Sequence, residues 1–303
     1  MFEIISALWP VFALILIGYV LRRIGFPGER FWQQAEKLTY YVLFPALLIH
    51  KLSLADMSQV ALGPVALSVF LVLSLGAIMA LILKPFANMP VASFSSVYQG
   101  SIRFNTYVGL AATSALLGSQ GLAIAAVIVS MMIPLVNIYC ILMFSVYLGQ
   151  SKGMMHSIIT MLKNPLIMSC VFGLLLNQFG FKMPGFSLPV LNVMGQAALL
   201  LGLLAVGAGL SFKVLLQSKH WLVLSSAIKL IVLPLCAYGV GQLFDLSALS
   251  LQILVLFSAL PTATSAYILA RQLGGDAPLM SVIITGQTLL SFITLPIILF
   301  FVV

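Results

Sequence analysis

Residues 99–113 read QGSIRFNTYVGLAAT, and the interpretation of the whole chain starts from them. The stretch lies between two long apolar runs, SVFLVLSLGAIMALILK at 68–84 and LAIAAVIVSMMIPLVNIYCILMF at 122–144. It places a charged residue, Arg103, an amide, Asn105, and several small residues inside a segment of membrane-spanning length. Irregular backbone at membrane depth persists only where protein or a water-filled cavity satisfies it. The stretch therefore predicts an interrupted helix that lines such a cavity.

The composition of the chain is that of a membrane protein. Of its 303 residues, 62% are hydrophobic and only 7% are charged, whereas a soluble globular domain carries about 25% charged residues. Mean hydropathy is +1.19, and apolar segments of about 20 residues, the length that spans a bilayer, recur throughout. We predict an all-α polytopic membrane protein with ten transmembrane helices.

Basic residues are distributed unevenly between the two sets of alternate loops. One set holds ten Lys and Arg residues and the other holds only Lys51 and Lys182, while Arg103 and Lys229 fall within spans. Because Lys and Arg concentrate in cytoplasmic loops, both termini are expected outside the cytoplasm, in the plasma or inner membrane. The formal net charge of +8 is then a topology signal, and no nucleic-acid partner is expected.

An internal repeat relates the two halves of the chain. Segment 103–122, RFNTYVGLAATSALLGSQGL, aligns with segment 259–278, ALPTATSAYILARQLGGDAP, at a constant offset that places Asn105 on Pro261. Each unit has an odd number of spans, so the second unit must enter the membrane in the opposite sense. The prediction is a first five-helix repeat, a cytoplasmic linker and a second, inverted five-helix repeat at residues 1–150, 151–163 and 164–303.

The polar interruptions fall in spans four and nine, at matching positions of the two units. In carriers built from inverted repeats, such a pair is the best sequence indication of the binding site. Two broken helices that cross near the midplane would direct their termini at a bound solute, and positive N-terminal ends favour an anion. For either span alone, an ordinary polar contact between helices is the competing interpretation.

The charged residues predicted deep inside spans are both cations, Arg103 and Lys229. An intramembrane ionisable residue is a functional candidate by default, and the sign of these two points to an anionic substrate. Each has a structural alternative, because Arg103 could support the break and Lys229 could cap carbonyls of a broken helix. The predicted substrate-binding residues are Arg103, Asn105, Thr106, Lys229, Pro261, Thr262, Thr264 and Ser265.

Several motifs of enzymes and metal sites are absent from the sequence. It contains no HExxH, P-loop GxxxxGK[ST] or CxxC, and Cys140, Cys170 and Cys236 are far apart in apolar segments. We predict a protein that is not an enzyme and needs no cofactor. Sodium as a coupling ion stays open, because a site made of backbone carbonyls leaves no trace in a sequence.

Five segments spread over the chain carry a family resemblance. They are KLTYYVLFPALLIHKLS at 37–53, RFNTYVGLAA at 103–112, LLGLLAVGAGLSF at 200–212, KLIVLPL at 229–235 and ALPTATSAYILARQLGGDAPL at 259–279. In this order they resemble the auxin efflux carrier family, including its bacterial malonate and malate permease-like members. The chain lacks the long central loop of the plant carriers and has no proline in its first break, so it looks like a minimal, prokaryote-like member.

The resemblance implies an architecture and a mechanism. Helices 1, 2, 6 and 7 would form a scaffold domain that usually makes a homodimer, and helices 3–5 and 8–10 a transport domain that moves beside it like an elevator. The family's first crossover asparagine falls on Asn105 and its second crossover proline on Pro261. Bile-acid sodium symporters share this architecture.

Together these observations predict a secondary transporter of small organic anions, such as auxin-like carboxylates or dicarboxylates. Its substrate would lie between the crossover and the face of spans one, two and seven. An inside-negative potential drives an anion outward by about 2.3 kcal/mol per charge per 100 mV. Because Asp and Glu are predicted only at span ends and in loops, potential-driven export is the simplest mechanism. A sodium-coupled symporter and a ligand sensor that does not transport are the alternatives.

Overall fold

The computed structural model describes residues 1–56, 60–149, 164–181, 183–212, 215 and 219–302. Within these ranges all regular structure is helical and strands are absent. Six of the described segments are long and apolar enough to cross a membrane. The prediction of an all-α polytopic membrane protein is thereby confirmed. The linker predicted at 151–163 and the loop residue Lys182 lie outside the described residues.

The helices follow one another along the chain with short connections, and two π-helical turns, η1 and η3, are built into longer helical segments. In chain order the elements are α1 (Phe2–Arg23), α2 (Glu29–Leu38), η1 (Thr39–Leu43), α3 (Phe44–Ser53), α4 (Leu62–Ala87), α5 (Val91–Ile102), α6 (Thr106–Leu148), α8 (Pro165–Gln178), α9 (Ser187–Ala208), α10 (Lys219–Ala227), η3 (Ile228–Val232), α11 (Leu233–Leu243), α12 (Ala248–Ser258), α13 (Ser265–Gln272) and α14 (Ala277–Phe300).

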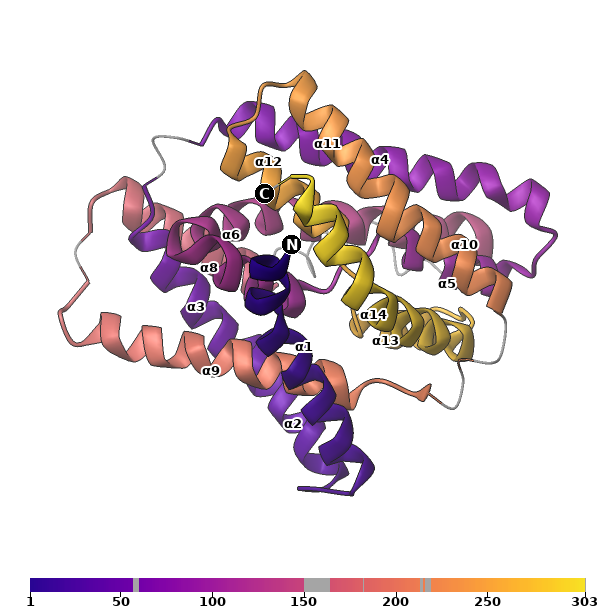
Figure 1. The fold of residues 1–303 in the computed structure, drawn as a ribbon, viewed down its shortest axis with the longest axis horizontal. Helices are drawn as coiled ribbons and strands as arrows, with labels where there is room; N and C mark the ends of the chain where they lie inside the picture. The colour runs from indigo at the N-terminus through magenta and orange to yellow at the C-terminus, as the bar shows by residue number, and fades with distance from the viewer. Residues whose placement is uncertain (57–59, 150–163, 182, 213–214, 216–218, 303) are drawn as a thin grey trace.

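The helices pack as two groups with α6 between them (Figure 1). In the first group α3 contacts α8 and α9, and α9 also contacts α1 and α2. In the second group α5 contacts α4, α10 and α14, while α11 packs on α4 and α12. Helix α6 packs against members of both groups. Figure 1 shows α9 along one edge of the molecule and α4 with α11 along the opposite edge.

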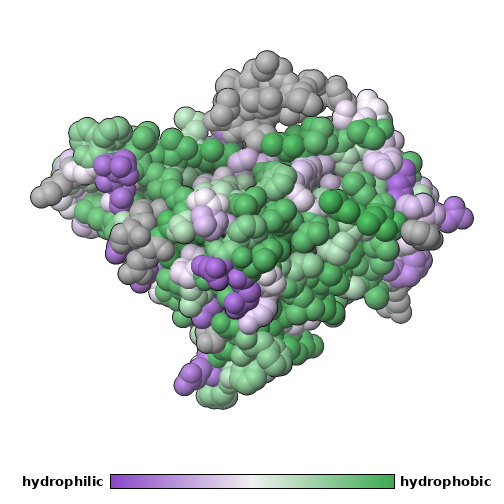
Figure 2. Space-filling view, turned by 90° about the horizontal axis from the view of Figure 1, so that it is seen from above, coloured by the Kyte–Doolittle hydropathy of each residue, from purple (hydrophilic) through white to green (hydrophobic). Residues whose placement is uncertain are grey.

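The outer surface of the molecule is apolar. Large hydrophobic side chains are exposed along several helices, among them Phe2, Trp9, Val146, Phe186 and Leu243. Figure 2 shows hydrophobic side chains covering most of one face, with hydrophilic ones at its two ends and in a group near its middle. Such an extensive apolar surface would aggregate in water, so the lipid bilayer is the solvent that this fold requires.

Two helical segments are interrupted where the sequence places its polar stretches. Helix α5 ends at Ile102 and α6 begins at Thr106, with Arg103 in an extended conformation. Helix α12 ends at Ser258 and α13 begins only at Ser265. Arg103 is thus part of the first break itself.

Helices α1 and α9 approach each other at backbone distance. A Cβ atom built on Gly18 would overlap the carbonyl oxygen of Leu204, and one built on Gly207 would overlap that of Ile15. Small residues at helix interfaces allow this approach in membrane proteins. Ordinary packing thus accounts for Gly207.

We expect Gly207→Ala to lower the free energy of unfolding by about 1–3 kcal/mol, the usual effect of overpacking a tight interface. The Ile15 carbonyl belongs to a packed helix and cannot move aside as a flexible side chain would. Gly239→Ala on α11 is the matched control, because nothing lies within 4 Å of a Cβ at that position. Thermal unfolding in detergent checks the pair, and equal stability of the two variants would contradict the close approach.

Candidate functional site

The two breaks lie side by side and are hydrogen-bonded to each other. The backbone N–H of Asn105 donates to the carbonyl oxygen of Pro261 at 2.8 Å. The hydroxyl of Thr262 lies 3.1 Å from the carbonyl oxygen of Gly100. Segments from distant parts of the sequence thus satisfy each other's backbone groups at the breaks, as buried irregular backbone requires.

Gln287, from the middle of α14, joins both breaks. Its amide oxygen accepts from the backbone N–H of Thr262 at 3.0 Å and lies 2.6 Å from the Thr262 hydroxyl. Its amide nitrogen donates to the carbonyl oxygen of Gly100 at 2.9 Å. Gln287 and Thr262 are fully buried, so the bonds form in a medium where an unpaired polar group is costly. Gln287 was not among the predicted site residues, although an amide within an apolar run is visible in the sequence.

Asn105 begins helix α6 and leaves one group available. Its side-chain oxygen accepts from the backbone N–H groups of Tyr107 and Val108 at 3.1 and 3.3 Å, the usual role of an N-cap. Its side-chain nitrogen is buried and has no hydrogen-bond partner among the described residues. The residue therefore offers an unused donor at the positive end of a helix.

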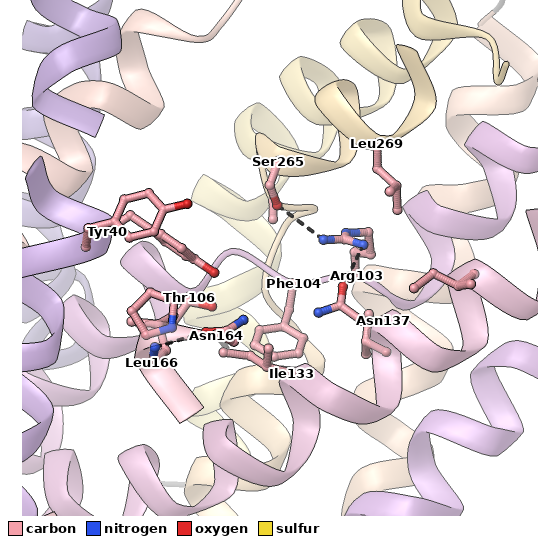
Figure 3. A pocket seen from close by; sticks show the side chains of 15 residues that line it. Tyr40, Arg103, Phe104, Thr106, Ile133, Asn137, Asn164, Leu166, Ser265 and Leu269 are labelled. Atoms are coloured by element: carbon pink, nitrogen blue, oxygen red, sulfur yellow. Dashed lines mark hydrogen bonds between the residues drawn. The ribbon is translucent and has the colours of Figure 1, made fainter. Parts of the chain in front are cut away.

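Arg103 extends from the first break toward the second. One terminal nitrogen donates to the side-chain oxygen of Asn137 on α6 at 3.2 Å, and the other donates to the hydroxyl of Ser265 at 3.3 Å. Nε is buried without a partner in the part of the chain that the structure describes. The salt bridge found within the described ranges joins Arg22 to Glu29, so the guanidinium has no carboxylate partner there. Figure 3 shows Arg103 between Ser265 and Asn137, across the cavity from Tyr40 and Thr106.

Arg103 faces a cavity of about 500 Å³. Its walls come from η1, both breaks, α6 and the start of α8, and its polar lining residues are Tyr40, Tyr41, Arg103, Thr106, Asn137, Asn164 and Ser265. An adjoining cavity of about 450 Å³ shares Tyr40, Tyr41, Thr106 and Ser265 with the first. The second cavity adds Gln33, Glu36, Lys37, Asn105, Tyr107 and Thr264. Both volumes are typical of sites for small organic molecules.

The structure brings five of the eight predicted site residues to these cavities. The five are Arg103, Asn105, Thr106, Thr264 and Ser265. Pro261 and Thr262 instead hold the two breaks together through the bonds described above. Lys229 lines neither cavity. Its ammonium lies 3.0 Å from the carbonyl oxygen of Ser258 and 3.4 Å from that of Phe257, which is the capping arrangement that the sequence left open.

The first cavity is bordered differently from what the sequence suggested. Its far wall comes from η1 and the start of α8, that is from spans two and six, rather than from spans one, two and seven. Asn137 and Asn164 were missed, and their only sequence signal is an amide within or beside an apolar run. The Asn164 side chain accepts from the backbone N–H of Leu166 and so begins α8.

Glu36 also lies in an unexpected place. The sequence analysis put it at the end of a span, yet in the structure it is half-buried on α2 and lines the second cavity. The two cavities together therefore hold two cations, Arg103 and Lys37, and one carboxylate.

Comparison with known proteins gives a consistent result over nearly the whole chain. The family model described as membrane transport protein matches residues 3–299. An uncharacterised transporter from Methanothermobacter thermautotrophicus is 25% identical over 289 residues, which cover 94% of each chain. An uncharacterised transporter from Methanocaldococcus jannaschii is 25% identical over 269 residues, which cover 86% of each chain.

We expect Gln287→Leu to destabilise the protein by about 1–3 kcal/mol for each buried polar group left unpaired. The neighbouring Thr288→Val is the matched control, since Thr288 is equally buried but its hydroxyl bonds only to the Ile284 carbonyl of its own helix. Thermal unfolding of both variants in detergent gives the comparison. A Gln287 variant as stable as the Thr288 variant would mean that the bridge between the breaks contributes little.

Proposed function

We propose that this chain, which belongs to the membrane transport protein family that includes the auxin efflux carriers, is a secondary transporter of small organic anions. Its relatives are named only as transporters, so the evidence for the substrate class lies in the chain's own residues. The observation that carries the proposal is the guanidinium of Arg103, which faces a cavity without a carboxylate partner among the described residues.

The donors around the two adjoining cavities suit a carboxylate. A guanidinium stays charged at any physiological pH and matches the two oxygens of a carboxylate. Arg103 Nε and the Asn105 side-chain nitrogen are buried donors without partners in the described part of the chain. Helices α6 and α13 both begin beside the cavity, at Thr106 and Ser265, and helix N-termini favour negative charge. A bound carboxylate would supply the acceptors that this arrangement lacks.

The architecture that we propose for transport has two inverted five-helix repeats, at 1–150 and 164–303, whose broken helices cross at the membrane midplane. The grouping of α1, α2, α3, α8 and α9, which α6 joins to the group of α4, α5, α10, α11, α12 and α14, supports a scaffold domain and a transport domain. The cavity lies between Arg103 and Ser265 of one group and η1 and α8 of the other, as an elevator-like movement requires. A homodimer in the plasma or inner membrane, with both termini outside the cytoplasm, completes the proposal.

The driving force that we propose is the membrane potential, which carries an anion out of the cell. The position of Glu36 favours a second candidate, import coupled to protons. Transporters commonly use embedded carboxylates as proton relays, and Glu36 lines the second cavity without an ion pair among the described residues.

Arg103→Gln is expected to reduce anion affinity at least tenfold, because a hydrogen bond to a charged group contributes about 1.5–3 kcal/mol. Charge movement in proteoliposomes is recorded on adding malonate, malate, indole-3-acetate or a bile acid, with and without sodium. Arg271→Gln, which removes an exposed basic residue from the last turn of α13, serves as control. Undiminished currents in the Arg103 variant would overturn the anion site.

A second substitution in the same assay separates binding from folding. Asn105→Asp keeps the side-chain oxygen that caps α6 and replaces the unpartnered nitrogen with a negatively charged acceptor. The helix start is thus retained while the proposed donor is lost. We expect a folded protein with strongly weakened anion currents.

Glu36→Gln distinguishes the two driving forces. If the membrane potential drives export, a proton gradient does not change the currents of the wild type. The Glu36→Gln variant then binds anions several-fold more tightly, because a negative charge has been removed from the cavity. Glu29→Gln on the same helix is the control, since that carboxylate pairs with Arg22 on the surface. Wild-type currents that follow a proton gradient, and lose this dependence in the Glu36 variant, would establish the second candidate instead.

A further inference from the structure

Lys229 is a buried cation that the proposed anion site does not use. It lies in η3, in the middle of the α10–η3–α11 segment, and is fully buried. Its ammonium nitrogen lies 3.0 Å from the carbonyl oxygen of Ser258, 3.4 Å from that of Phe257 and 6.0 Å from the ring centroid of Phe104. Since Phe104 lines the first cavity, the charge lies close to the site without facing it.

The two carbonyls belong to the C-terminal end of the first half of an interrupted helix. Helix α12 ends at Ser258, and the next N–H, of Ala259, bonds back to the carbonyls of Val255 and Leu256. The last carbonyls of a helix have no partner within it and carry the negative end of its dipole. Lys229 therefore places a positive charge at the negative end of α12.

The other break shows that a charge is not needed merely to satisfy carbonyls. At the end of α5 the carbonyl of Gly100 accepts from Gln287, and the hydroxyl of Thr262 lies within hydrogen-bond distance of it. These donors are neutral and buried. Burying an ammonium costs far more than burying an amide or a hydroxyl. The presence of a lysine ammonium at the C-terminal end of α12 thus points to a need for positive charge there.

The charge of Lys229 is not cancelled by a neighbouring carboxylate. Within the described ranges its ammonium hydrogen-bonds to the two carbonyls, lies near the Phe104 ring and forms no salt bridge. In carriers with broken helices, half-helix C-terminal ends and unwound carbonyls are the places where coupling cations bind. Lys229 occupies such a place with a covalently attached cation.

We propose that the ammonium of Lys229 is a resident cation that takes the place of a mobile coupling ion at the end of α12. The inference rests on the proposed function, because a coupling ion has meaning only in a transporter. Transport by this chain would then be independent of sodium. The protein itself, through Lys229, would supply the positive charge that favours the anion. The inference also predicts that removing the side chain creates a site for a small cation between the same carbonyls.

The test measures thermal unfolding of purified protein in choline, sodium or methylammonium chloride at equal ionic strength. Wild type is expected to melt at the same temperature in all three salts. Lys229→Ala is expected to melt at a lower temperature in choline and to regain stability selectively in sodium or methylammonium. Lys84→Ala is the control, because the Lys84 ammonium lies over the Tyr147 ring at 3.6 Å from its centroid and leaves no carbonyl site behind.

Two results would overturn the inference. One is a wild type stabilised by sodium relative to choline, and the other is a Lys229→Met variant that matches wild type in stability and transport, since that variant fills the space without the charge. If Lys229→Ala does not fold, the measurements on the wild type and on Lys229→Met still test the inference. The melting measurement needs no substrate, so it is independent of transport. If sodium or methylammonium stabilises Lys229→Ala but the protein transports no anion, only the proposed function is refuted. If the protein transports anions but sodium stabilises the wild type, only this inference is refuted.

Discussion

The hydrogen bond between the Asn105 N–H and the Pro261 carbonyl is the constraint on which the other features of the site depend. Two helices can be broken inside a membrane only if the freed backbone groups find partners, and here each break supplies partners for the other. Gln287 and Thr262 complete the arrangement with neutral, fully buried groups. Because the breaks are held in this way, two helix N-termini face the same cavity.

Charge is distributed unequally around this neutral framework. Arg103 leaves the first break on the cavity side, where it meets only neutral acceptors in the described part of the chain. Lys229 reaches the second break from η3 and meets the end of α12. An anion entering the cavity would therefore meet the guanidinium of Arg103, which no carboxylate among the described residues neutralises, with the Lys229 ammonium buried nearby.

Much of the fold and part of the site could be predicted from the sequence. Apolar segments of spanning length, interrupted by Arg103 and Asn105 in one half and by Pro261 in the other, indicated a membrane protein and where its helices break. The directions of side chains could not be predicted, because lipid-facing and buried faces of a membrane helix are both apolar and helical periodicity is weak. For this reason the sequence did not indicate that Tyr40 lines the cavity.

The central claim is that an organic anion binds between the two breaks, and an electron cryo-microscopy structure in lipid nanodiscs with the transported carboxylate tests it most directly. The account predicts carboxylate density within hydrogen-bond distance of Arg103 Nε and the Asn105 side-chain nitrogen, the two donors that lack partners in the described residues. Density for the anion elsewhere in the protein, with Arg103 still bonded only to Asn137 and Ser265, would contradict it.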